Sequence, residues 1–336
     1  MKLDTSKVYL IAEIGMNHEG SLGQAKMLAK AAAENGADSV KFQMHISCEE
    51  TLHNAPTPAY FKNEGRYEYF DRTAFNKEQW IELRDYCHEL GVDFMVSPFS
   101  IEAVRRLVEI GVDIIKIPSG EVTNTPYLEY IAKTGICTIL SSGMSTDKEV
   151  REAYDILKQG TGEVLLLQCS SEYPCRPENL GLNVMQDMMR DYEGVRVGLS
   201  DHSFGIWSSI SAVTLGATMI ERHFTLSKLM YGPDAKMSLE PAEFKMLRES
   251  IDNAYVAIHS SVDKSDISQY EQMRVTFQKS IVAKSDLKAG TVLSEEHFAY
   301  KKPGDGIIAN RYRDLIGKKL NRDVNIDDKF TEDMFD

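Results

Sequence analysis

The chain has 336 residues, of which 43% are hydrophobic and 26% charged, a composition typical of globular proteins. Its formal net charge of -13 argues against general binding to nucleic acids or anionic membranes, because such a surface repels phosphate groups. A chain of this length exceeds the usual size of one hydrophobic core, so we expect one large domain and a smaller one.

The sequence carries no sign of export or of a membrane anchor. It has no run of about 18 or more apolar residues, and its first residues lack the basic and apolar stretches of a secretory signal. The five cysteines form no CxxC pair, which fits reduced thiols, and we expect Cys169 and Cys175 to be ordinary core or loop thiols. The expected compartment is the cytoplasm.

Eight short apolar runs follow one another along the first three quarters of the chain. They span residues 8–15, 39–45, 93–99, 113–120, 137–144, 163–169, 195–201 and 218–224. Segments of helical periodicity lie between them, and several end at a glycine, as expected just past a helix C-terminus. This alternation predicts parallel strands joined by helices, and eight such units predict a closed (β/α)8 TIM barrel.

A doubly wound open sheet is the alternative architecture. Such sheets usually have fewer strands and a glycine-rich dinucleotide-binding turn after the first strand, whereas the turn here reads GMNHEGS. We therefore expect a barrel over residues 1–260 and, over 261–280, a polar linker with at most a short helix. Residues 281–336 alternate short β-like runs with turn residues, which predicts a small β-rich domain that is marginally stable alone.

Polar residues gather at the C-terminal ends of the predicted strands, where barrels of this type carry their active sites. These residues are Glu13, Lys41, Gln43, Ser97, Lys116, Ser119, Ser141, Ser171, Tyr173, Ser200, His202, Glu221 and His223. Alternate residues of a strand face the same side, so Lys41 and Gln43 share one face of their strand. The same rule links Ser200 with His202. The pattern predicts one polar pocket.

Two inward lysines, Lys41 and Lys116, favour an anionic ligand in this pocket. A buried ammonium group must be compensated or lose its proton, and a phosphate or carboxylate of a substrate is a natural partner. Hydroxyl groups from the nearby serines suit the oxygens of such a ligand. The alternative is that both lysines pair with barrel carboxylates such as Glu13 or Glu121.

Two histidines at the ends of neighbouring strands, His202 and His223, favour a divalent metal ion. Two imidazoles can share one cation at about 2.1 Å each and leave positions open for water and substrate. The alternative is that each is a structural histidine. We expect His18, which also lies in this region, to make hydrogen bonds rather than bind metal.

Seven motifs stand in the order in which they occur in the sialic acid synthase family, and the chain resembles that family over its whole length. The motifs are IAEIGMNHEGSLGQAKMLAKAAAENGADSVKFQ, VSPF, IKIPSGE, SSGMS, CSSEYP, GLSDHS and IERHFT. The segment SIVAKSDLKAGTVLSEEHFAYKKPGDGI resembles the antifreeze-like (SAF) domain that follows the barrel in this family.

The resemblance implies a transferase that condenses phosphoenolpyruvate with N-acetylmannosamine or a close N-acetylated hexose. The products would be a nine-carbon 2-keto-3-deoxy acid and phosphate. It implies that phosphoenolpyruvate is held by Lys41, Ser97, Lys116, Ser119, Ser141 and Ser200. It also implies a divalent cation on His202 and His223, most often Mn²⁺, with Mg²⁺ or Co²⁺ as alternatives.

The sugar is implied to contact Glu13, Gln43, Tyr173 and Asp234, the last in a GPD motif. We expect catalytic roles for Lys41, Lys116, His202 and His223, and for Glu13 as the group that positions or deprotonates a water molecule. The family further implies a domain-swapped homodimer, in which the antifreeze-like domain of the partner covers the site.

Two residues depart from the family pattern and leave the sugar open. Ser171 stands where well-known members carry an asparagine near the phosphoenolpyruvate, and Lys302 replaces an arginine that reaches the N-acetyl group. The alternatives are a legionaminic or pseudaminic acid synthase, or one that uses a sugar 6-phosphate. A Schiff-base aldolase and a sugar-binding protein without activity are alternatives of other classes.

Overall fold

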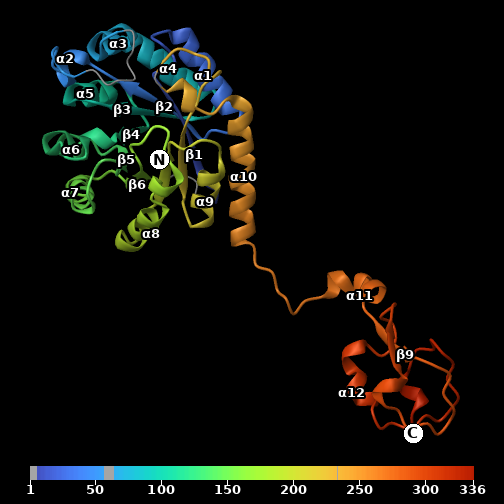
Figure 1. Ribbon diagram of the computed structural model, residues 1–336. Helices are drawn as coiled ribbons and strands as arrows, with labels where there is room; N and C mark the ends of the chain where they lie inside the picture. The colour runs from blue at the N-terminus through green and yellow to red at the C-terminus, as the bar shows by residue number, and fades with distance from the viewer. Residues whose placement is uncertain (1–5, 57–63, 233) are drawn as a thin grey trace. The chain divides into compact units, whose positions relative to one another are not determined.

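The computed structural model describes residues 6–56, 64–232 and 234–336 (Figure 1). The chain divides into two compact units, one up to Ser260 and one from Ser261 onward. Among the described helices, none combines the length and the apolar character that crossing a membrane requires.

The first unit is a closed barrel of eight parallel strands, so the predicted barrel is confirmed. The strands are β1 Tyr9–Gly15, β2 Ser39–Met44, β3 Asp93–Pro98, β4 Ile114–Ile117, β5 Cys137–Ser141, β6 Val164–Cys169, β7 Val197–Asp201 and β8 Met219–His223. Each strand pairs with the next, and β1 pairs with both β2 and β8, which closes the ring. Every strand lies within, or nearly within, its predicted run.

Helices surround the strands, as Figure 1 shows. They are α1 Leu22–Glu34, α2 Ser47–Glu50, α3 Arg66–Thr73, α4 Lys77–Glu89, α5 Ile101–Ile110, α6 Thr125–Ala132, α7 Asp147–Leu157, α8 Leu182–Asp191, α9 Trp207–Thr214 and α10 Pro241–His259. Local sequence sets several ends. The Ser100 side chain caps the start of α5, and Gly111, at φ 84°, ends it in a left-handed conformation that glycine adopts without strain.

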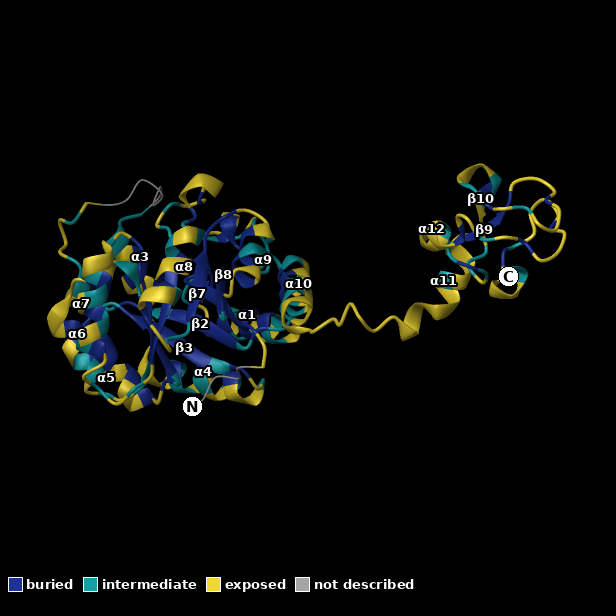
Figure 2. Cartoon of the chain, turned by 90° about the horizontal axis from the view of Figure 1, so that it is seen from below, coloured by how far each residue is buried: buried dark blue, intermediate teal, exposed yellow. Residues whose placement is uncertain are grey.

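Inward-facing positions change from apolar to polar along most of the strands. Apolar side chains fill the barrel interior toward the N-terminal ends of the strands. They are Tyr9, Ile11, Met95, Ile114, Ile139, Leu165, Leu167 and Met219. Two residues further along, the same faces carry polar groups: Glu13 follows Ile11, and Lys116 follows Ile114. Outward-facing strand residues pack against the buried sides of the helices (Figure 2). The barrel is therefore closed by apolar packing at one end and lined by polar groups at the other.

The second unit has its own small core. Strand β9 Ser280–Ala283 pairs antiparallel with β10 Phe298–Lys301, and buried Ile281, Leu315 and Phe330 pack beside them. Its helices are α11 Glu271–Phe277 and α12 Tyr312–Leu315. Residues 261–280, expected to form a linker, contain α11.

An outward-facing ion pair joins β7 and β8 behind the polar end of the barrel. Asp201 and Arg222 are cross-strand neighbours, are each 1% exposed, and lie 2.6 Å apart (Oδ2 to Nη1). Asp201 also accepts hydrogen bonds from the hydroxyls of Ser208 and Ser209, at the start of α9. This network ties both strands to the same helix.

We expect Arg222→Met to lower the free energy of unfolding by about 3–5 kcal/mol, because Asp201 would keep a buried charge without its cation. Arg190→Met, which removes an exposed ion pair with Asp187 in α8, should change it far less. Urea unfolding followed by tryptophan fluorescence measures both. Equal losses in the two variants would contradict the assignment of a structural role to this pair.

Candidate active site

A cavity of about 720 Å³ opens at the C-terminal ends of the barrel strands. Its lining includes Glu13, Lys41, Gln43, Ser97, Lys116, Ser119, Ser141, Ser171, Tyr173, Ser200, His202, Glu221, His223 and Asp234. The structure thus gathers every site residue predicted in the barrel into one cavity. Lys302 lies in the second unit, where its ammonium group lies 5.1 Å from the centre of the Phe277 ring.

Several lining residues escaped the sequence analysis, among them His45, Arg66, Phe70, Phe99 and Cys169. Strand parity could have found His45 and Phe99, since each follows a predicted site residue of the same face by two positions. The residues of α3 gave no such signal. Cys169 was expected to be an ordinary thiol, but it lines the cavity, and its Sγ lies 3.6 Å from the Ser119 hydroxyl oxygen.

Two ammonium groups and two carboxylates alternate in the floor of the cavity. Lys41 Nζ lies 3.1 Å from Glu13 Oε2 and 3.2 Å from Glu221 Oε1, and Lys116 Nζ lies 3.3 Å from the same Glu221 oxygen. All four residues are buried. The alternative in which barrel carboxylates compensate the lysines is therefore correct, with Glu221 in place of Glu121. Burying these lysines does not by itself require a bound anion.

The charges shift the proton affinities of these groups. Burial works to raise the pKa of Glu221, but the ammonium groups of Lys116 and Lys41 outweigh it and hold that pKa well below the ordinary value. Burial likewise works to lower the pKa of Lys41, but Glu13 and Glu221 outweigh it and raise the pKa. For Lys116, burial prevails over the attraction of Glu221 and lowers the pKa.

Unpaired polar atoms around this cluster indicate a ligand. Within the described residues, the Ser97 and Ser141 hydroxyls and Glu221 Oε2 are buried without a hydrogen-bond partner. Buried polar groups are normally paired, and an unpaired one costs about 1–3 kcal/mol. Hydroxyl donors beside ammonium groups suit the oxygens of a phosphate or a carboxylate, so the anion site is supported by the hydroxyls rather than by the lysines alone.

The two predicted metal ligands lie side by side, with ring centres 5.4 Å apart. His202 Nδ1 lies 2.8 Å from the Ser170 carbonyl oxygen, which only accepts, so Nδ1 carries a hydrogen and Nε2 is the nitrogen that could bind a metal ion. Burial lowers the pKa of His223 to about 3, so this imidazole is neutral, and its Nδ1 has no hydrogen-bond partner among the described residues.

These two imidazoles fit a borderline divalent cation, which prefers nitrogen ligands of this kind. Asp234 Oδ2 lies 3.9 Å from His223 Nδ1. No set of three or more His, Cys, Asp or Glu side chains arranged for a metal ion occurs in the part of the chain that the structure describes. The remaining ligands would therefore have to be water or substrate oxygens.

His18, expected to make hydrogen bonds, does so outside the cavity. Its Nδ1 accepts a hydrogen bond of 3.0 Å from the Gly20 amide, and its ring stacks on Phe75. Burial lowers its pKa to about 3, which keeps the ring neutral.

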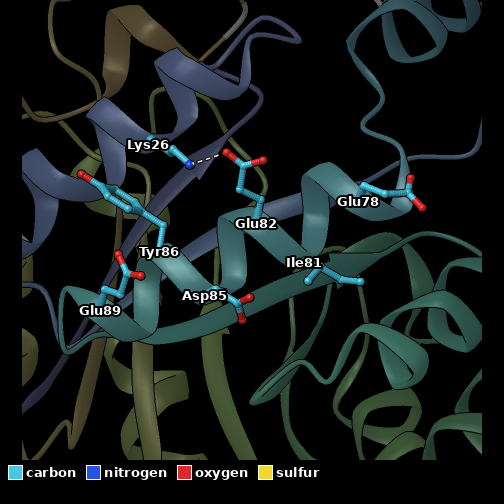
Figure 3. Close-up of a pocket in the computed structure, with 7 residues that line it drawn as sticks. All are labelled: Lys26, Glu78, Ile81, Glu82, Asp85, Tyr86 and Glu89. Atoms are coloured by element: carbon cyan, nitrogen blue, oxygen red, sulfur yellow. Dashed lines mark hydrogen bonds and ion pairs between the residues drawn. The ribbon is translucent and has the colours of Figure 1, made fainter.

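A second pocket lies on the outer surface of the barrel along α4 (Figure 3). Its lining consists of Lys26, Glu78, Ile81, Glu82, Asp85, Tyr86 and Glu89. Lys26 is paired with Glu82 at 2.6 Å, so the remaining carboxylates leave the pocket negative. A negative pocket repels phosphate, and the barrel mouth remains the candidate site.

We expect Glu221→Gln to destabilise the protein by about 3–5 kcal/mol near pH 6, because two buried ammonium groups lose their shared carboxylate. The pKa of Lys116 should then fall further below its unfolded value, so the unfolded state binds more protons and stability rises with pH. The deficit relative to the unmodified protein should shrink toward about pH 9. Urea unfolding at several pH values measures this, and a deficit that grows with pH would contradict it.

Comparisons with known proteins identify the family of this chain. A model described as the NeuB family matches residues 28–263, and one described as the SAF domain matches residues 278–336. The resemblance seen in the motifs is thereby confirmed, including the antifreeze-like domain.

Several named synthases are similar over nearly their full length. The N,N'-diacetyllegionaminic acid synthase of Campylobacter jejuni is 38% identical, over 97% of this chain and 99% of that protein. The human N-acetylneuraminate-9-phosphate synthase is 34% identical, over 98% and 92%. The crystal structure of an N-acetylneuraminic acid synthetase from Leptospira borgpetersenii, in complex with citrate, is 29% identical with a TM-score of 0.70, over 80% of this chain and 90% of that one. The chain belongs to the NeuB family of sugar acid synthases.

Proposed function

We propose that this protein condenses phosphoenolpyruvate with N-acetylmannosamine or a close N-acetylated hexose, and releases a nine-carbon 2-keto-3-deoxy acid and phosphate. One observation carries the proposal. A single cavity joins two buried ammonium groups and unpaired hydroxyls, which suit an anion, to a pair of adjacent imidazoles and a carboxylate–amide pair. A reaction between a phosphorylated acid and an aldehyde sugar needs these groups together.

Phosphoenolpyruvate would occupy the side of the cavity that holds the cations. An ammonium group has three N–H donors, so Lys41 and Lys116 can keep their carboxylate partners and still donate to phosphate or carboxylate oxygens. The neighbouring hydroxyls would complete the set, from Ser97, Ser119, Ser141, Ser171 and Ser200. Ser200 donates to Glu221 at 2.9 Å, so its hydroxyl would have to turn away from Glu221 to donate to a ligand oxygen.

The bond-forming step joins the methylene carbon of phosphoenolpyruvate to the aldehyde carbon of the sugar. Water then adds to the former enol carbon, and phosphate leaves with cleavage of the carbon–oxygen bond. Glu13 is suited to orient or deprotonate that water, because its carboxylate lines the cavity beside Lys41. Lys41 and Lys116 would stabilise the negative charge of the departing phosphate.

His202 and His223 would hold a divalent cation, for which we propose Mn²⁺, with Mg²⁺ or Co²⁺ as alternatives. When bound, such a cation supplies Lewis-acid stabilisation of the sugar aldehyde oxygen. Asp234 and Tyr173 line the same part of the cavity and would bind the sugar, together with Gln43. The Tyr173 hydroxyl lies 3.1 Å from His202 Nε2, so substrate or metal binding would have to move one of these groups.

We further propose that the protein acts as a domain-swapped homodimer in the cytoplasm. The antifreeze-like domain of the partner would cover the cavity and exclude bulk water from the intermediate. Its Lys302 would replace the family arginine at the N-acetyl group, with a point charge instead of a planar fork. Five free cysteines are in keeping with a reducing compartment.

A second substrate class has support of its own. The similar proteins from Campylobacter jejuni and Legionella pneumophila, at 38% and 35% identity, are both named N,N'-diacetyllegionaminic acid synthases. A diacetylated hexose is therefore the alternative sugar, and a pseudaminic acid precursor or a sugar 6-phosphate comes next.

Phosphate release from phosphoenolpyruvate and Mn²⁺ tests the proposal, with N-acetylmannosamine, its 6-phosphate and diacetamido hexoses as acceptors. We expect one of these sugars to cause phosphate release, and no release when that sugar is left out. The mass of the product should match the condensation of that sugar with phosphoenolpyruvate. Release with none of them would refute the synthase. Borohydride trapping with pyruvate would in addition label the protein if it were a Schiff-base aldolase.

We expect His202→Ala and His223→Ala each to lower both Mn²⁺ affinity and turnover by roughly 100-fold or more, because one imidazole cannot hold the cation alone. Mn²⁺ binding measured by calorimetry gives a readout independent of activity. The control is His88→Ala, a half-exposed histidine of α4 paired with Asp113. Unchanged Mn²⁺ affinity in either cavity variant would refute the proposed metal site.

A further inference from the structure

A chain of side-chain hydrogen bonds runs from α2 into the cavity. Glu50 Oε1 lies 2.7 Å from His45 Nδ1, and His45 Nε2 lies 3.2 Å from Gln43 Oε1. Gln43 Nε2 in turn donates to Glu13 Oε1 at 2.7 Å. The chain therefore ends on the carboxylate that we assign to the water molecule and on the amide that we assign to the sugar.

His45 is held in place on every side. It is 5% exposed, and its ring is stacked between Phe70 and Phe99, with ring centres 3.5 Å and 4.0 Å away. Glu50, its partner, also accepts a hydrogen bond from the Ile46 amide, which fixes the carboxylate at the start of α2. Stacking alone would be served by a phenylalanine, so the two ring nitrogens need another explanation.

The hydrogen-bond chemistry allows only one orientation of the Gln43 amide. A carboxylate such as Glu13 only accepts, so the amide nitrogen must face it, and the amide oxygen faces His45. His45 Nε2 must then carry a hydrogen, because two acceptors cannot face each other at 3.2 Å. His45 Nδ1 and Glu50 Oε1 lie 2.7 Å apart and likewise cannot both act as acceptors, so a proton lies between them. Burial lowers the pKa of His45, and Glu50 opposes this.

The fixed orientation has a consequence for the ligand. An amide nitrogen carries two hydrogens, and within the described part of the chain the Gln43 nitrogen donates to Glu13 alone. Gln43 lines the cavity, so its second N–H remains for a ligand. The hydrogen bond to Glu13 decides that the amide nitrogen, and not the oxygen, faces Glu13. That bond alone would leave the Gln43 side chain free to rotate, and the hydrogen bond from His45 to the amide oxygen prevents this.

We propose that His45 and Glu50 are positioning residues that fix Gln43 as a hydrogen-bond donor, so that this subsite accepts an oxygen of the sugar and rejects a donor-only group such as a free ammonium. The proposal rests on the proposed function for the identity of the ligand. His45 takes part in no chemical step under this proposal. It acts on the ligand by positioning Gln43, and Gln43 in turn contacts Glu13.

The variant His45→Phe keeps the stack between the two phenylalanines and removes both hydrogen bonds. We expect kcat/KM for the sugar to fall by roughly 10- to 100-fold, because a misplaced binding group costs about that much. The KM for phosphoenolpyruvate and the Mn²⁺ affinity should change by about twofold or less. Glu50→Gln preserves a hydrogen bond to Nδ1 and should lose less, which provides a second variant if His45→Phe folds poorly.

A matched control is His18→Phe, since His18 is also buried and stacked on a phenylalanine but lies outside the cavity lining. We expect its sugar kinetics to stay within about twofold of the unmodified protein. Circular dichroism and thermal unfolding establish that each variant is folded. A sugar-specific loss in His18→Phe as large as that in His45→Phe would mean that the effect is structural.

A double-mutant cycle decides whether His45 acts through Gln43. If it does, His45→Phe should cost about twofold or less when Gln43 is already alanine, because the group it positions is gone. Full multiplication of the two single losses would overturn the proposal. If the unmodified protein turns over no sugar, the proposed function fails, but ¹⁵N NMR of the resting protein still tests the orientation, and an unprotonated His45 Nε2 would refute it.

Discussion

The cavity depends on one buried carboxylate, Glu221, that is shared by two ammonium groups. Lys41 and Lys116 both lie within 3.3 Å of its Oε1 atom, and Ser200 donates to the same oxygen. Without that carboxylate, two neighbouring buried cations would repel each other and lose charge, and the barrel mouth would hold no stable set of donors. Glu221 thus offsets the charge of both ammonium groups before any substrate arrives, and the unpaired hydroxyls around them define where ligand oxygens can bind.

Successive residues of a strand face opposite sides, and this places the charged cluster inside the barrel and the ion pair that supports it outside. On β7 and β8, inward positions carry Ser200, His202, Glu221 and His223, while the outward positions between them carry Asp201 and Arg222. The ion pair behind the barrel wall therefore joins the same two strands that present the imidazoles in front of it. A residue that stabilises the fold and a residue that lines the cavity alternate along one strand, so a change in either affects the geometry of the other.

The two substrates would meet between groups from opposite parts of the barrel. Lys116 and most of the hydroxyls come from β3 to β7 and the turns after them, whereas Glu13, Lys41 and Gln43 come from β1 and β2. One Glu13 oxygen pairs with Lys41 and the other accepts from Gln43. The position of this carboxylate is therefore set by two neighbours on β2.

The sequence alone determined the strands, their inward and outward faces, the family and the gathering of polar residues at one end of the barrel. These features follow from periodicity and from motifs, which are local. Tertiary structure alone decided the partners. Glu221, rather than Glu121, pairs with the lysines, because closing the ring brings β8 close to both β2 and β4 across the barrel interior. The contact between His45 and the α3 residue Phe70, and the exposure of Cys169 to the cavity, likewise depend on how separate segments pack, which no spacing along the chain encodes.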